Sequence, residues 1–219
     1  HLNDIGYKIV GEKLEKFLQG KPIAEQEIGR LLIMETIAFS ETSMCRRKYI
    51  LHYFGEEFAS SDCNQMCDNC KNPKPTSEGK VEVKKLLEVI IECKQRFKPK
   101  EIAKIIIGES NSLIKQHMSQ ISHVFGSGKE KSIQFWHSII RQVYVKQLIT
   151  KEIESYGVLK ITDKGIDFIK SPKSFMITED HDYNELNDQK IITNQKGLAL
   201  DNKLYAILKD LRKQQAKAI

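Results

Sequence analysis

The sequence lacks the features that mark a membrane protein or a secreted protein. None of its apolar runs reaches the roughly 18 residues needed to cross a bilayer. The N-terminus, His1–Asp4, has no signal-peptide pattern, and without a starting Met we expect the chain to be a piece of a longer protein. Its five cysteines are an odd number, and three of them crowd between Cys63 and Cys70, unlike a secreted disulfide framework. We therefore predict a reducing compartment and no membrane partner.

Signatures of catalysis are also missing. The six histidines are scattered, and no Ser/His/Asp or Cys/His set stands out for nucleophilic chemistry. The segment Gly126–Ser132 looks like a phosphate loop, but a Walker A loop needs Gly where His123 stands and Ser or Thr where Glu130 stands. We predict no catalytic residue and no ATP site in this chain.

Positive charge is in excess, with a net charge of +6 and a pI of about 8.9. This charge is compatible with a polyanionic partner, although many basic proteins bind no nucleic acid. A length of 219 residues is more than one small core needs, so we expect two or three modest domains.

The first third of the chain predicts a helical hairpin. Pro22 suits a first helical turn, and apolar residues recur with near-helical spacing up to Phe39. A second helix is expected from Thr42 to Phe54, with Gly55 as its stop. Residues 59–80 then form a polar loop that has too little apolar content to bury a core.

Four cysteines provide a set of metal ligands that would order this loop. They are Cys45, Cys63, Cys67 and Cys70, spaced x17, x3 and x2. Zinc prefers four ligands in a tetrahedron, and a C-x2-C turn brings two thiolates to one ion. His52 and Asp62 are substitute ligands, and a set of unrelated free thiols is the alternative. We predict one structural zinc with no open coordination position, which orders the loop.

The rest of the chain predicts a winged helix, so the expected fold is mainly α with a small β-hairpin. An amphipathic helix begins near Val81, and Cys93 lies on its apolar face as a core residue. Further helices are expected over 101–107, 111–125, 132–147 and 162–169, with strands over 148–153 and 158–161. Helices followed by a hairpin are typical of a winged helix-turn-helix.

Two motifs carry a resemblance to a known family. Cys45–Glu56, with its Cys-Arg-Arg and Tyr-Phe-Gly-Glu, followed by Cys67–Cys70, resembles the zinc-binding subdomain of RecQ-family DNA helicases. Phe125–Lys129, then Trp136 and Ile140–Gln142, resemble the winged-helix part of that family's RecQ C-terminal (RQC) region.

The resemblance implies five segments. They are a motor-lobe tail over 1–20, a zinc-binding helical module over 21–78, a winged-helix domain over 79–172, a flexible linker over 173–200, and a truncated start of an HRDC domain over 201–219. The last rests on Leu204–Arg212, which resembles the first HRDC helix.

The function implied is a DNA-binding accessory region of an ATP-dependent 3′–5′ DNA helicase that acts in replication, recombination and repair. ATP and Mg²⁺ would belong to motor lobes absent from this chain. The partners would be DNA, as duplex, fork or single-strand/duplex junction, and a single-strand-binding protein. The location would be cytoplasmic, and nucleoid-associated in a bacterium. The alternatives are an independent zinc-containing winged-helix transcription regulator and a protein-interaction scaffold.

Seven residues are expected to contact DNA. They are Ser110, Asn111, Lys115, Lys129, Lys131, Tyr156 and Lys160. The loop bearing Lys129 and Lys131 precedes a helix and could touch phosphates, although a solvated basic loop is an equal alternative. Glu109 departs from the family's basic pattern and should weaken the local field. An exposed Tyr156 at the hairpin tip could stack on a terminal base pair as a strand-separating wedge, although this wing is short.

Overall fold

The computed structural model describes residues 18–152 and 154–180, which all belong to one compact unit of the chain. Most of the expected motor-lobe tail, much of the expected linker and the expected HRDC helix lie outside these residues. Within the described ranges, no helix combines the length and the apolar composition that a bilayer crossing requires.

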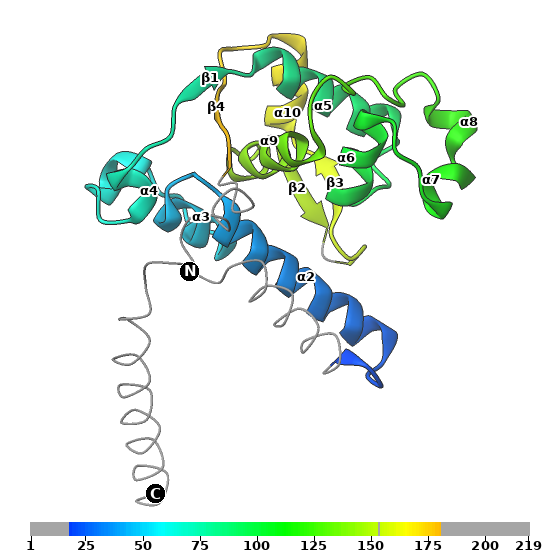
Figure 1. Ribbon diagram of the computed structural model, residues 1–219, viewed down its shortest axis with the longest axis horizontal. Coiled ribbons are helices and arrows are strands. Elements are labelled where there is room, and N and C mark those ends of the chain that lie inside the picture. Colours follow the sequence, from blue (N-terminus) through cyan, green and yellow to red (C-terminus); the bar gives the residue numbers. More distant parts are fainter. Residues whose placement is uncertain (1–17, 153, 181–219) are drawn as a thin grey trace, which may run out of the picture. The chain divides into compact units, whose positions relative to one another are not determined.

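The predicted helical hairpin is present (Figure 1). Helix α2 spans Ile23–Glu41 and α3 spans Arg46–Tyr53. The turn between them is fixed by Asn69, whose side-chain amide donates to the carbonyls of Thr42 (2.8 Å) and Met44 (2.7 Å). Two short helices follow, η1 over Ser60–Cys63 and α4 over Asp68–Lys71. The loop segment therefore folds back onto the hairpin through polar contacts.

The winged helix has a core of its own. Its helices are α5 over Lys80–Glu92, α6 over Pro99–Ile107, α9 over Ile133–Val145 and α10 over Asp163–Lys170. Strands β2, Ile149–Glu152, and β3, Val158–Ile161, form the predicted antiparallel wing. Leu86, Trp136 and Leu159 are fully buried where these elements meet. The apolar periodicity of the sequence thus corresponds to real packing faces.

One expected helix is broken. Residues 111–125 form α7, Ser112–Gln116, and α8, Met118–Ile121, followed by turns. His117 separates the two with φ −108° and ψ 7°, and its ring packs edge-on against Phe97 at 5.6 Å. The prediction of a single helix was wrong because the helical spacing of apolar residues continues across a backbone break.

The chain returns to the start of the winged helix after α10. Strand β4, Met176–Thr178, pairs antiparallel with β1, Thr76–Glu78, so Thr76 faces Thr178. Phe175 and Ile177 are buried, with exposed fractions of 4% and 3%. Residues 173–180 therefore belong to the folded domain, and the expectation that the linker begins at residue 173 was wrong.

Candidate metal centre and nucleic-acid interface

The four predicted cysteines lie together. Cys45 precedes α3, Cys63 ends η1, Cys67 is the N-cap of α4, and Cys70 lies within α4. Their sulfur atoms all lie within 4.8 Å of one another. Sulfurs about 3.8 Å apart are expected in a tetrahedral zinc site with bonds of roughly 2.3 Å. A small inward movement would bring all four thiolates to one ion, so this donor set fits a structural zinc.

Polar contacts around the cluster hold its loops in place. The Arg46 guanidinium binds the Asp68 carboxylate through two bonds of 3.1 Å, which ties α3 to α4. The backbone N–H of Cys70 points at Cys67 Sγ at 3.4 Å, an arrangement that favours a thiolate at this position. Of the two substitute ligands, Asp62 is exposed, and the His52 ring packs on Tyr144 at 4.7 Å. Neither belongs to the cluster.

Cys93 stands apart from the metal cluster, as predicted. It is buried in the winged-helix core. Burial raises the pKa of its thiol to about 12, so it stays protonated and inert at neutral pH.

The glycine-rich loop at residues 126–128 packs against the end of α6 and against Trp136. The backbone N–H groups of Gly126 and Gly128 donate to the carbonyls of Ile105 and Ile106, both at 2.8 Å, at the end of α6. The Trp136 indole donates to the Gly128 carbonyl at 3.0 Å. These N–H groups cannot also cradle a phosphate, which agrees with the rejection of a Walker A loop.

The same packing brings two of the expected DNA-binding segments side by side. A Cβ atom added to Gly108 would lie only 3.3 Å from Gly126 Cα, so the backbone at Gly108, where one segment begins, lies against the backbone at Gly126. Ser110 and Lys129 are exposed in these segments. The Asn111 side chain already makes one hydrogen bond within the protein, because its Oδ1 accepts from the N–H of Ile114 at 2.8 Å and caps α7.

Charges beside these segments are only partly neutralised. Glu130 pairs with Lys85 at 3.0 Å. Lys115, Lys129 and Lys131 are exposed, and Lys131 Nζ lies 5.0 Å from the centre of the Phe135 ring. The edge formed by residues 108–115 and 126–131 therefore presents three lysines to solvent.

Comparison with known proteins identifies the family. The family model described as "RQC domain" matches residues 73–185, just over half of the chain, and the one described as "RecQ zinc-binding" matches residues 11–71. The chain belongs to the RecQ family. With the family match, the four-thiol cluster fits the structural zinc site of a RecQ zinc-binding module.

Curated relatives of this RecQ-family chain carry helicase names. It is 29% identical over 208 residues to the "ATP-dependent DNA helicase RecQ" of Pasteurella multocida, covering 93% of this chain and 32% of that protein. It is 30% identical over 209 residues to the protein of that name from Haemophilus influenzae, covering 93% and 33%. It is 25% identical over 140 residues to "ATP-dependent helicase SGS1" of Saccharomyces cerevisiae, covering 58% and 9%. The chain thus spans about a third of the length of the bacterial relatives.

The wing of this RecQ-family chain does not present a free aromatic tip. Tyr156 is half-buried, and Lys98 Nζ lies 5.7 Å from the centre of its ring. A Cβ atom added to the next residue, Gly157, would lie 2.8 Å from a methyl group of Leu31 on α2. The expectation of an exposed Tyr156 was wrong because the tip packs against the zinc-binding module. Lys160 lies on β3, 3.7 Å from Glu152 of the paired strand.

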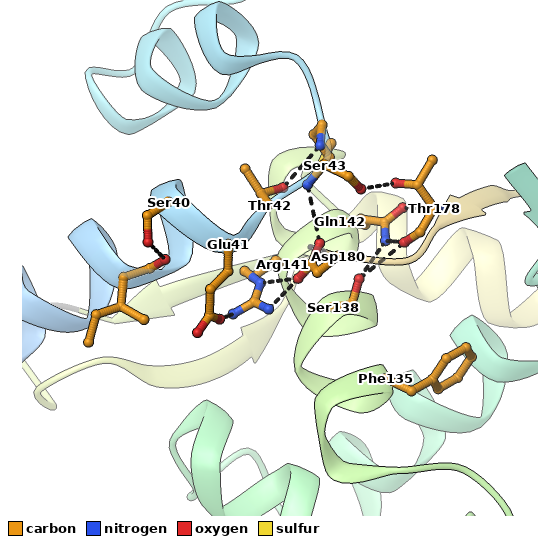
Figure 2. A network of polar contacts seen from close by, with 12 residues as sticks. Ser40, Glu41, Thr42, Ser43, Phe135, Ser138, Arg141, Gln142, Thr178 and Asp180 are labelled. Atoms are coloured by element: carbon orange, nitrogen blue, oxygen red, sulfur yellow. Dashed lines mark hydrogen bonds and ion pairs between the residues drawn. The ribbon is translucent and has the colours of Figure 1, made fainter. Parts of the chain in front are cut away.

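No local sequence pattern predicted the polar network that joins α9, the segment around β4 and the end of α2 (Figure 2). Arg141 binds Asp180, with Nε to Oδ2 at 2.7 Å, and Glu41, with Nη1 to Oε2 at 2.9 Å. Gln142 holds both backbone groups of Thr178, accepting from its N–H at 3.0 Å and donating to its carbonyl at 2.6 Å. The polar side of α9 therefore faces other parts of the RecQ-family fold.

Burial affects one carboxyl group of this network. It raises the pKa of Glu41 above its ordinary value, and the nearby Arg141 only partly offsets that rise. Residues 141 and 180 are 39 positions apart, so no local pattern could have found their pairing.

Proposed function

We propose that this region grips duplex DNA by its phosphates beside a fork, as an accessory part of an ATP-dependent 3′–5′ DNA helicase. The supporting observation is the exposed edge at residues 108–115 and 126–131, where two segments distant in sequence meet and carry Lys115, Lys129 and Lys131. Helicase names among the relatives support the same proposal. Phosphate contacts would position the protein on DNA without reading its sequence.

The contacts made by the polar side chains of α9 favour binding to the DNA backbone over recognition of DNA bases. A transcription regulator inserts the polar side of its recognition helix into the major groove. Here Ser138 and Gln142 bind Thr178, while Arg141 binds Asp180 and Glu41. These side chains are unavailable to base edges, which argues against the alternative of an independent regulator.

The zinc would have a structural part in this function. It would fix the loop after α3 and supply no reacting group, because four thiolates fill its coordination shell. ATP and Mg²⁺ would be bound by motor lobes elsewhere in the parent protein. A fork or single-strand/duplex junction as the preferred DNA and a single-strand-binding protein as a partner are parts of the same proposal. So are a cytoplasmic location and, in a bacterium, association with the nucleoid.

The test is a double substitution, Lys129→Ala with Lys131→Ala, in the full chain. Binding to several duplexes would be followed by fluorescence anisotropy between about 50 and 200 mM salt. We expect weaker binding to every sequence alike, and a log–log salt slope smaller by about 2, because each lost phosphate contact removes about 0.9.

The matched control is Lys170→Ala with Lys173→Ala, which removes two exposed lysines elsewhere on the domain. It should leave most of the affinity intact. If both double variants bind equally, or if the first binds as the parent does, the edge does not contact DNA.

A further inference from the structure

Helix α2 meets the winged helix through a row of ion pairs, called the seam below. Glu27 Oε2 accepts from Lys98 Nζ at 2.8 Å, and Glu41 Oε2 accepts from Arg141 Nη1 at 2.9 Å. Between them, Glu35 binds Lys151. In each pair α2 supplies the carboxylate, and the winged helix supplies the base.

The carboxylates of the seam are regularly placed along one straight element. They lie eight and six residues apart on α2, or about 12 and 9 Å at a rise of roughly 1.5 Å per residue. Lys151 is well covered by this contact, with a side-chain exposed fraction of 18%, and Lys98 is partly covered, with an exposed fraction of 37%. Helix α2 thus holds a line of negative charge against a line of bases, as a nucleic-acid strand would.

We infer that α2 masks a second phosphate-binding row on the winged helix, formed by Lys98 and Lys151, and that a nucleic-acid backbone displaces α2 from it. This inference rests on the proposed DNA binding and extends it from one edge of the domain to two. While α2 is packed on the winged helix, only the exposed edge at residues 108–115 and 126–131 contacts the DNA. Once α2 is displaced, the bases of the seam contact the DNA as well.

The seam is suited to opening because little apolar surface holds it closed. Its apolar cluster is small, with three buried residues and three partly buried ones: Ala38, Tyr49 and Val145, and Phe39, Met44 and Tyr144. Within the described part of the chain, Glu35 Oε2, Tyr49 Oη and His52 Nε2 are buried there without a hydrogen-bond partner. Buried polar atoms without partners destabilise the closed arrangement, and they would regain water on opening.

The winged helix would survive such a movement. Its main core lies among α5, α6, α9 and the wing, and includes Leu86, Trp136 and Leu159 but no residue of α2. The tip of the wing would change most. Gly157 is now covered by Leu31 of α2, and it would become accessible only when α2 leaves.

The first test removes the masking charges. The variant Glu27→Gln with Glu35→Gln keeps side-chain shape and weakens two of the three pairs. Its control is Glu25→Gln with Glu88→Gln, which neutralises two exposed carboxylates away from the seam. We expect the seam variant to bind a duplex more tightly than the control, with a log–log salt slope larger by up to about 2.

A further variant identifies the bases responsible. Adding Lys98→Gln and Lys151→Gln to the seam variant should abolish the gain in affinity. If the gain persists without these lysines, or if the seam variant gains no more than its control, the inference is overturned.

The second test follows α2 in the unchanged full chain by hydrogen–deuterium exchange. Adding saturating duplex DNA should speed amide exchange across residues 23–41, because a helix separated from its packing partner is marginal. Binding with unchanged exchange there would overturn the masking and leave the proposed function intact. Absence of any DNA binding would overturn both.

Discussion

The contact between Gly128 and Trp136 makes Gly128→Ala a sharp test of the winged-helix core. A Cβ atom at position 128 would lie 2.4 Å from Trp136 Cζ2 and 2.5 Å from Ile106 Cγ2. Neither neighbour can easily withdraw, because Trp136 and Ile106 are both fully buried. The indole would have to shift, and its hydrogen bond to the Gly128 carbonyl, now 3.0 Å, would lengthen.

The expected cost follows from two contributions. Overpacking a well-filled core costs about 1–3 kcal/mol. A weakened buried hydrogen bond adds roughly 1 kcal/mol. A loss of about 3 kcal/mol in the free energy of unfolding corresponds to a midpoint lower by roughly 10–20 °C for a domain of about 100 residues.

The assay uses a reporter that the chain already contains. Trp136 is the only tryptophan of the sequence, so its fluorescence reports unfolding of this core. Ser127→Ala is the control, because the Ser127 hydroxyl is buried without a partner in the described structure and its removal should cost nothing. A Gly128→Ala protein within about 0.5 kcal/mol of the parent would refute the packing described here.

Three further predictions concern the metal, the DNA-binding edge and pH. Cys67→Ser should release the zinc, as measured by elemental analysis. It should also speed amide exchange within residues 21–78 while the winged helix stays folded. Full retention of zinc by this variant would contradict the ligand set. Asn111→Asp should keep the cap on α7, so the free energy of unfolding should change by less than about 0.5 kcal/mol. Its affinity for duplex DNA should fall, because a negative charge is added. Asn111→Ala should instead lower the free energy of unfolding by about 1 kcal/mol. Burial lowers the pKa of His137 to about 4, so the unfolded chain takes up this proton first. The stability that depends on a neutral His137 is therefore complete above about pH 6.5 and is lost as the pH falls towards 4. In the His137→Asn variant, the free energy of unfolding measured in urea should change less with pH across that window. If its slope against pH equals that of the parent, the ring is not buried in its neutral form.

Local patterns predicted much of this fold correctly. Helical periodicity located α5 and α9, and the turn at residues 155–157 located the wing between β2 and β3. The spacing of the four cysteines predicted their cluster, because a polar loop rich in thiols has few other ways to become ordered.

Features that depend on distant partners were beyond this reasoning. Strand β4 has only three residues, and its pairing with β1 joins positions about 100 residues apart in sequence. The pair between Glu35 and Lys151 spans 116 positions, so neither residue carries a local sign of its partner. Tyr156 was misjudged for the same reason, since Lys98, which lies over its ring, comes from a distant part of the sequence.

The pairing of β1 with β4 also determines how the winged helix would bear a mechanical load. The chain enters the domain at Thr76 and leaves it at Thr178, and these two residues face each other at the outer end of the strand pair. A pull between the zinc-binding module and the segment beyond β4 would open this pair one step at a time, first Thr76–Thr178, then Ser77–Ile177, then Glu78–Met176. The first step would also have to break the two hydrogen bonds between Gln142 and Thr178 and the ion pair between Arg141 and Asp180. The strand pair would therefore resist the pull until these side-chain contacts break, and would separate step by step only afterwards.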